Sequence, residues 1–137
     1  MGKAEAHAEA LELANAERIA FAQSCREGAW RRVVPGEGWP VGVRIHHGAA
    51  GHPLLTGRIR ELLCAGRVEG SLAELGAANA GHAERFAGVS VDEAVAACRR
   101  TGAAAAAHRR TLPDADLDRE RPTGIAGGRT LTSRPGR

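Results

Sequence analysis

The stretch Gly36–His52 reads GEGWPVGVRIHHGAAGH, and the interpretation of the whole chain starts from it. It contains one of the two tryptophans, a proline placed to begin a helix, and three of the six histidines. Proline is tolerated in the first turn of a helix because its missing N–H would have no partner there. We therefore expect a helix that begins near Trp39-Pro40 and runs toward Ala65, with Gly66 as its C-terminal cap.

Pro53 lies inside this expected helix. It removes a backbone hydrogen bond, crowds the carbonyl of Ala49 and disfavours helical angles at His52. Three glycines nearby weaken the helix further. We expect a kink or a break at His52–Pro53. Beyond it, an apolar stripe is formed by Leu55, Ile59, Leu62 and Leu63.

Three more helices are predicted. The segment Met1–Glu27 has no proline and is dense in strong helix formers. Its expected buried face consists of Leu11, Ala14, Ile19, Phe21, Ala22 and Cys25.

The other two helices are expected over residues 71–88 and 90–112. Each begins with a serine followed three residues later by glutamate, which is the pattern of a capping box. The face shared in the first consists of Leu72, Leu75, Asn79, His82, Ala83 and Phe86. The inward face of the second consists of Val91, Val95, Cys98, Gly102, Ala105 and Ala106.

The length of 137 residues suits one domain, and aromatic residues make up only 3%. A core of alanine and aliphatic side chains favours helices packed on helices. We predict an all-α antiparallel helix bundle over residues 1–121, ending in a turn or short helical piece at Asp114–Asp118. Residues 122–137 are rich in glycine, proline and arginine, and we expect an exposed or disordered tail there.

Charge and cysteine usage exclude several classes. The net charge is only +3, and basic residues alternate with acidic ones, as in Glu17-Arg18, so we expect no nucleic-acid partner. No stretch has membrane-spanning length, so we expect no membrane partner. Cys25, Cys64 and Cys98 form no C-x-x-C pair. Reduced thiols packed in the core of a cytoplasmic protein are favoured over a thiol nucleophile.

The spacing of the histidines bears on metal binding, which requires three or four convergent ligands. Neighbouring residues on a helix point about 100° apart, so at most one of His46 and His47 can face the core. His46, His47 and His52 are not expected to converge on one ion. On spacing alone, His47 is interpreted as a buried histidine with one hydrogen-bond partner rather than as a ligand. His52 is interpreted as a solvent-exposed or helix-breaking residue.

His82 lies on an apolar helix face, three residues after Asn79. Two interpretations remain open for them: a hydrogen-bonded pair in the core, or a pair that lines a pocket. His108 is expected at the surface, and His7 is expected to be inert in an N-terminal turn.

Several phrases then resemble a known family. These are Trp39-Pro-Val with His47 eight residues after the tryptophan, Asn79-Ala-Gly-His-Ala-Glu-Arg-Phe-Ala-Gly, and Leu112-Pro-Asp-Ala-Asp-Leu-Asp. Over residues 11–132 the chain resembles the DinB superfamily, in particular the branch of mycothiol-dependent maleylpyruvate isomerase metal-binding domains. This resemblance implies a four-helix bundle that binds a divalent metal, often zinc or nickel, through three histidines. One of them matches His47, and the other two form an H-x-x-x-H pair on the last helix. Some members use a low-molecular-weight thiol, which the metal activates as thiolate.

No histidine follows His108, so the chain lacks the H-x-x-x-H pair. Gly127–Thr132 looks like the lead-in to that last helix. We expect a shortened or degenerate member with an incomplete metal site, His47 as the remaining ligand, and Asn79 and His82 lining the pocket. An active protein of this kind would be a metal- and thiol-dependent transferase or isomerase acting on a small-molecule thiol or electrophile. The alternative is a non-catalytic helical interaction or dimerisation module, because a bundle that lacks a helix exposes an apolar groove suited to a homodimer or to a partner helix.

Overall fold

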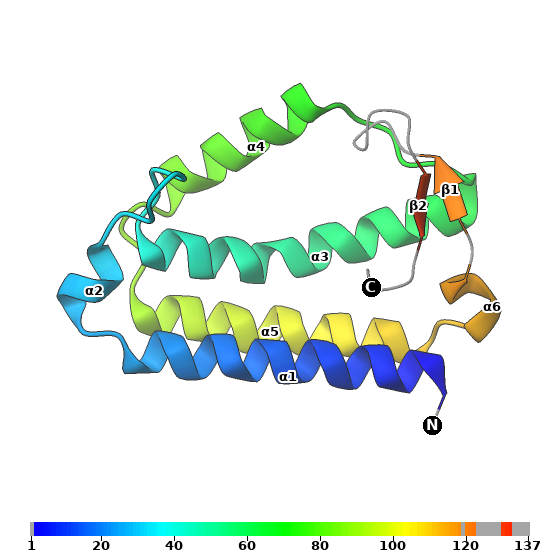
Figure 1. The fold of residues 1–137 in the computed structure, drawn as a ribbon, viewed down its shortest axis with the longest axis horizontal. Coiled ribbons are helices and arrows are strands. Elements are labelled where there is room, and N and C mark those ends of the chain that lie inside the picture. The colour runs from blue at the N-terminus through cyan, green and yellow to red at the C-terminus, as the bar shows by residue number, and fades with distance from the viewer. Residues whose placement is uncertain (1, 119, 123–129, 133–137) are drawn as a thin grey trace.

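The computed structural model describes residues 2–118, 120–122 and 130–132, and within them the fold is an all-α helix bundle (Figure 1). The helices are α1 (Lys3–Ser24), α2 (Glu27–Arg31), α3 (Val41–Ala65), α4 (Leu72–Arg85), α5 (Val91–Arg110) and α6 (Asp114–Leu117). Two short strands, β1 (Glu120–Pro122) and β2 (Thr130–Thr132), follow them.

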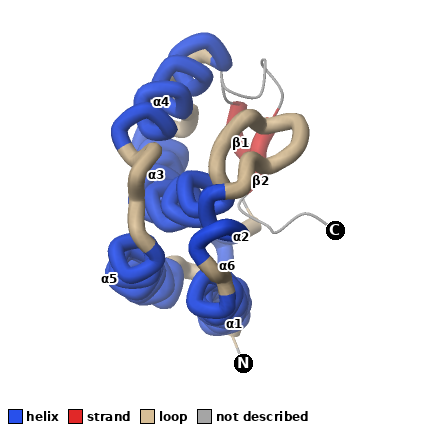
Figure 2. Tube along the Cα trace, turned by 90° about the vertical axis from the view of Figure 1, so that its left-hand side faces the viewer, coloured by secondary structure: helices blue, strands red, loops and turns tan. Residues whose placement is uncertain are grey.

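Helix α5 is the centre of the bundle. It packs along both α1 and α3, whereas α1 and α3 make few contacts with each other. Seen end-on, α1, α3 and α5 occupy the corners of a triangle, and α4 lies beyond α3 (Figure 2). No residue of α4 is buried, and its contacts with α3 are sparse. The expected four-helix arrangement is therefore a three-helix body with a lightly attached fourth helix.

Local signals account for most helix ends. The capping box predicted at Ser90 and Glu93 is present, with both of its hydrogen bonds. At Ser71 the side chain accepts from the backbone N–H of Glu74, which is the serine half of the predicted box. Gly66 ends α3 with a φ of 75°, a left-handed conformation that favours glycine.

Helix α3 runs without a break through Pro53, so the predicted break was wrong. The proline ring occupies the wall of a hollow between α3 and α5. About one turn before and one turn after it, Ala49 and Thr56 are buried. Packing against α5 on both sides of the proline offsets the hydrogen bond that the proline cannot make.

Helices α1 and α5 approach closely through small residues and one asparagine. Asn15 is 8% exposed, and its Nδ2 donates to the carbonyl of Cys98 at 2.9 Å. A Cβ at Gly102 would lie 2.3 Å from that Nδ2, so Asn15 needs the glycine. The predicted inward face of α5 is confirmed. The predicted face of α1 was wrong at Ala14, which is exposed, and at Phe21, which is 51% exposed, and α1 ends at Ser24 rather than at Glu27.

The short helix α2, which the sequence pattern did not predict, inserts Trp30 into the core. This side chain is 1% exposed, and its Nε1 donates to the carbonyl of Val89 at 2.8 Å. The face of the indole lies against Gly42 at the start of α3. Ala22, Val89, Ala94 and Val95 complete this core cluster.

The short helical piece predicted after residue 112 is confirmed as α6, with Leu117 buried. β1 and β2 pair in antiparallel register, Arg121 opposite Leu131. β1 spans the predicted boundary between the bundle and the tail, and residues 130–132 form a strand rather than entering a helix. The rest of the predicted tail, 123–129 and 133–137, lies outside the described residues.

Candidate functional site

A tight turn places Trp39 at the entrance to α3. The N–H of Val34 donates to the carbonyl of Trp39 at 2.7 Å. Gly36 and Gly38, between them, have φ values of 82° and 75°, which residues with a Cβ rarely adopt. The indole ring then lies against His47 on the second turn of α3, with ring centroids 5.2 Å apart.

Three histidines meet between α3 and α4. His46 Nδ1 and His82 Nε2 lie 2.9 Å apart, and one of these nitrogens donates to the other. The ring of His47 contacts the other flank of His82, with centroids 5.0 Å apart. Phe86 stacks on His46 at 4.0 Å and joins this cluster to the core.

The expectation that only one of His46 and His47 could have a buried role was wrong, because both rings are half-buried against His82. Helix α4 lies beside one flank of α3, and its His82 contacts both His46 and His47. Periodicity within α3 carries no information about which helix covers that flank.

Of the predicted site residues, His47 and Asn79 line one hollow. It measures about 320 Å³ and is lined by Glu37, Trp39, Arg44, His47 and Asn79. His82 is the immediate neighbour of His47 behind this lining. Arg44 and Glu37 form an ion pair at 3.3 Å across the rim. Asn79 and His82 make no hydrogen bond to each other in the described structure, and of the two only Asn79 lines the hollow, whereas His82 is bonded to His46.

The cluster favours neutral imidazoles. Burial lowers the pKa of His46 most, followed by the positive charge of Arg100, and burial followed by Arg44 lowers that of His47. For His82 the causes of a lowered pKa are burial and then the neighbouring imidazoles. The buried Nδ1 atoms of His47 and His82 have no hydrogen-bond partner in the described structure. Buried polar atoms normally have a hydrogen-bond partner, so these two nitrogens could each still form one hydrogen bond.

The cluster does not fit a metal centre. A protein zinc site directs at least three ligand atoms at one point, but His46 and His82 direct ring nitrogens at each other. Among the residues that the structure describes, no group of three or more His, Cys, Asp or Glu side chains could hold a metal ion.

The other histidines lie elsewhere, and two expectations about them need correction. His52, expected at the surface or as a helix breaker, is half-buried inside continuous α3, with its Nε2 3.3 Å from Nη1 of Arg18 on α1. His108, also expected at the surface, is half-buried, and its Nδ1 is enclosed without a partner.

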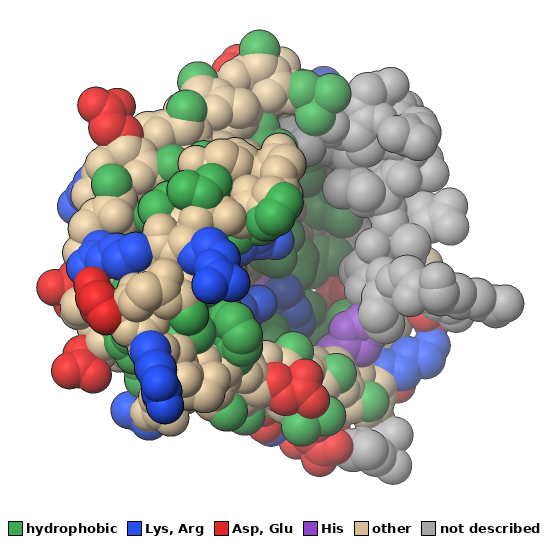
Figure 3. Space-filling model, turned by 60° about the vertical axis from the view of Figure 1, so that its left-hand side comes forward, with side chains coloured by type: hydrophobic (Ala, Val, Ile, Leu, Met, Phe, Trp, Pro, Cys, Tyr) green, Lys and Arg blue, Asp and Glu red, His purple; other side chains and the backbone are tan. Residues whose placement is uncertain are grey.

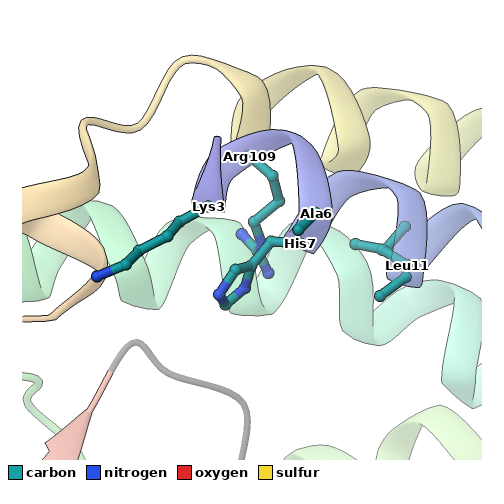
Figure 4. Close-up of a pocket in the computed structure, with 6 residues that line it drawn as sticks. Lys3, Ala6, His7, Leu11 and Arg109 are labelled. Atoms are coloured by element: carbon teal, nitrogen blue, oxygen red, sulfur yellow. The ribbon is translucent and has the colours of Figure 1, made fainter. Parts of the chain in front are cut away.

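His7, expected to be inert, borders a second hollow. Figure 4 shows Arg109 reaching from α5 past α1 toward α3, with His7 beside its guanidinium and Lys3 directed away. Burial lowers the pKa of Arg109, and its Nη1 has no partner among the described side chains. Lys3 is paired with Asp118.

The cysteines differ from one another. Cys98 is buried, and burial raises the pKa of its thiol, which makes it a poor nucleophile. Cys25 packs against the core, as predicted. Cys64 is exposed, so the prediction that all three pack in the core was wrong for this residue.

The chain matches no protein-family model, no curated protein and no solved structure. None of the helices in the described part of the chain has the length and apolar character needed to cross a bilayer.

Proposed function

We propose that this chain is a DinB-like helical domain, related to metal- and thiol-dependent transferases or isomerases, that binds a small molecule without forming a metal centre of its own. The observation that carries the proposal is that His47 and Asn79 line one hollow and that His82 contacts the ring of His47. The motif resemblance selected these residues from two distant parts of the sequence. Their proximity is what a retained ligand pocket would require.

The chemistry of the pocket supports binding of a thiol or of a polar electrophile. The Asn79 amide and the neutral imidazoles offer both donors and acceptors. At the rim, a carboxylate on the ligand would compete with Glu37 for the guanidinium of Arg44. The indole of Trp39 gives an apolar wall. Turnover through a bound metal is not part of the proposal, because the described donors do not converge.

A zinc and nickel titration of the purified chain tests the metal part of the proposal. We expect dialysis to remove either metal, because two imidazoles without a third ligand bind weakly. Retention of one zinc or nickel per chain, lost in His47→Ala but not in the control His7→Ala, would contradict it.

Ligand binding is tested separately, with a low-molecular-weight thiol that carries a carboxylate, such as glutathione, as the probe. Trp39 borders the hollow, so a saturable change in tryptophan fluorescence is expected. Asn79→Ala should weaken the fluorescence change. The control is Gln23→Ala, at an exposed position of α1, because Asn15 is buried and its substitution would disturb the core. Equal responses of Asn79→Ala and Gln23→Ala would count against the pocket.

A homodimerisation module is the second candidate, favoured by the exposed apolar side chains. Leu13, Phe21, Leu54 and Leu55 are 47% to 64% exposed. The molecule is also hollowed on the side seen in Figure 3, with hydrophobic and basic side chains in the wall of the hollow. Sedimentation at several protein concentrations should detect a dimer. A monomer at every concentration would leave the binding domain as the remaining function.

A further inference from the structure

A separate hollow lies between the C-terminal halves of α3 and α5. It measures about 270 Å³ and is bordered by Thr56 and Arg60 from α3 and by Arg100 and His108 from α5. Ala104 and Ala105 form part of its wall. The residues known to line it include two arginines and no carboxylate. The histidine pocket uses the other half of α3, so the two hollows are distinct.

The hollow lies in a positive field. Arg60 and Arg100 make no ion pair with any carboxylate of the described residues, whereas Arg58 on the adjacent side of α3 is paired with Glu61. The pKa of His108 is lowered first by burial and then by the positive charges of Arg60 and Arg109. The charges of Arg60 and Arg109 therefore act on the wall of the hollow that His108 forms.

Two polar atoms in the wall have no partner. Thr56 is 9% exposed, and its Oγ1 makes no hydrogen bond in the described structure. Nδ1 of His108 is enclosed in the same way. Buried hydroxyl and imidazole groups are normally hydrogen-bonded, because leaving them unpaired is unfavourable. A ligand that accepts hydrogen bonds would neutralise the arginines, and it would satisfy both enclosed atoms once the Thr56 and His108 side chains turn toward it.

We propose that this hollow binds the phosphate group of a small molecule. Arginine forks match the tetrahedral oxygens of phosphate and donate two hydrogen bonds at once. Two guanidinium groups suit a dianion better than a monocarboxylate. The hollow is smaller than a typical drug-sized pocket and has no Phe, Tyr or Trp ring in its known lining, so the ligand is inorganic phosphate or a short phosphate ester rather than a nucleotide.

Calorimetric titration distinguishes these two sources of the phosphate group. Inorganic phosphate and glycerol 3-phosphate are titrated separately at constant ionic strength, with acetate as the monocarboxylate comparison. We expect saturable binding of at least one phosphate compound and none of acetate. The tighter of the two identifies whether the ester carbons add contacts with the alanine wall.

Arg99 and Arg100 provide a matched pair of variants. Both are exposed on α5, but only Arg100 borders the hollow. Arg100→Ala should weaken phosphate binding by roughly tenfold or more, the effect of losing a charge-assisted hydrogen bond, and Arg99→Ala should leave it nearly unchanged. Equal losses in the two variants would show a diffuse charge effect and overturn the proposal.

The variant Thr56→Val distinguishes the contribution of the threonine hydroxyl from that of its packing. Valine keeps the shape of threonine and removes the unpaired oxygen, so the free protein should unfold at an unchanged or higher temperature. The same variant should bind phosphate roughly tenfold more weakly. Unaltered phosphate affinity in Thr56→Val, or the absence of saturable phosphate binding in the native chain at millimolar concentration, would refute the site.

Discussion

Substituting Gly42 by alanine tests how tightly the core is built around Trp30. A Cβ at this position would lie 2.5 Å from Cε2 and Nε1 of the indole, so the ring or the helix would have to move by about 1 Å to restore ordinary contact. The ring is fixed by its hydrogen bond to the Val89 carbonyl and is 1% exposed. It therefore has little room in which to move.

The magnitude follows from three contributions. Overpacking a well-filled core costs about 1–3 kcal/mol. Distorting the buried indole hydrogen bond costs a further ~1 kcal/mol. Gly42 is the second residue of α3, so the gain in helix propensity from alanine is at most about 1 kcal/mol in the opposite direction. We expect Gly42→Ala to lower the free energy of unfolding by about 1–3 kcal/mol in total.

Urea unfolding followed by circular dichroism measures this change. The matched control is Gly57→Ala in the same helix, where the added Cβ meets nothing within 4 Å and the residue is exposed. It should stabilise the protein by about 0.5–1 kcal/mol. If Gly42→Ala stabilises as much as Gly57→Ala does, the packing of Trp30 against α3 is not as described. Trp30→Phe in the Gly42→Ala background should recover part of the loss, because the smaller ring makes room.

Three further predictions concern buried polar groups and caps. Asn15→Ala should lower the free energy of unfolding by about 1–3 kcal/mol, because the Cys98 carbonyl loses its side-chain donor and a void opens; urea unfolding measures it. Ser90→Ala should cost about 0.5–2 kcal/mol of global stability, whereas Ser71→Ala should mainly increase amide hydrogen exchange in lightly packed α4. Burial lowers the pKa of His82 and of its neighbours below their ordinary value near 6.5, so the unfolded chain binds protons first. Stability is then complete above about pH 6.5 and falls as the pH drops below it, and His82→Gln should flatten this dependence in unfolding measured between pH 5 and 8.

The sequence predicted those parts of the fold that depend on local chemistry. Ser90 with Glu93, and the glycine at position 66, mark helix ends because capping is decided within a few residues. The inward face of α5 followed from a period of 3.6 residues, since this helix is covered on two sides and its buried stripe is wide.

Tertiary contacts decided the rest. Pro53 was expected to break α3, but the packing of α3 against α5 outweighs the local penalty. Asn15 carried no sequence signal for burial, because its partner is a backbone carbonyl on a helix 83 residues away. The histidine cluster was missed for the same reason. His46 and His47 point in different directions on α3, and both contact the ring of His82 only because α4 lies beside them.

The position of the candidate site gives it a mechanical role as well as a chemical one. Helix α4 has no buried residue, and its sparse contact with α3 includes the His46–His82 hydrogen bond and the rings around it. Protonating these imidazoles would place like charges within one cluster and weaken the attachment of α4. A ligand that binds between Trp39 and Asn79 would bridge the entrance of α3 to α4 and strengthen that attachment. The lightly packed helix α4 contributes Asn79 to the lining of the pocket, so binding of the proposed ligand would be thermodynamically linked to the docking of α4.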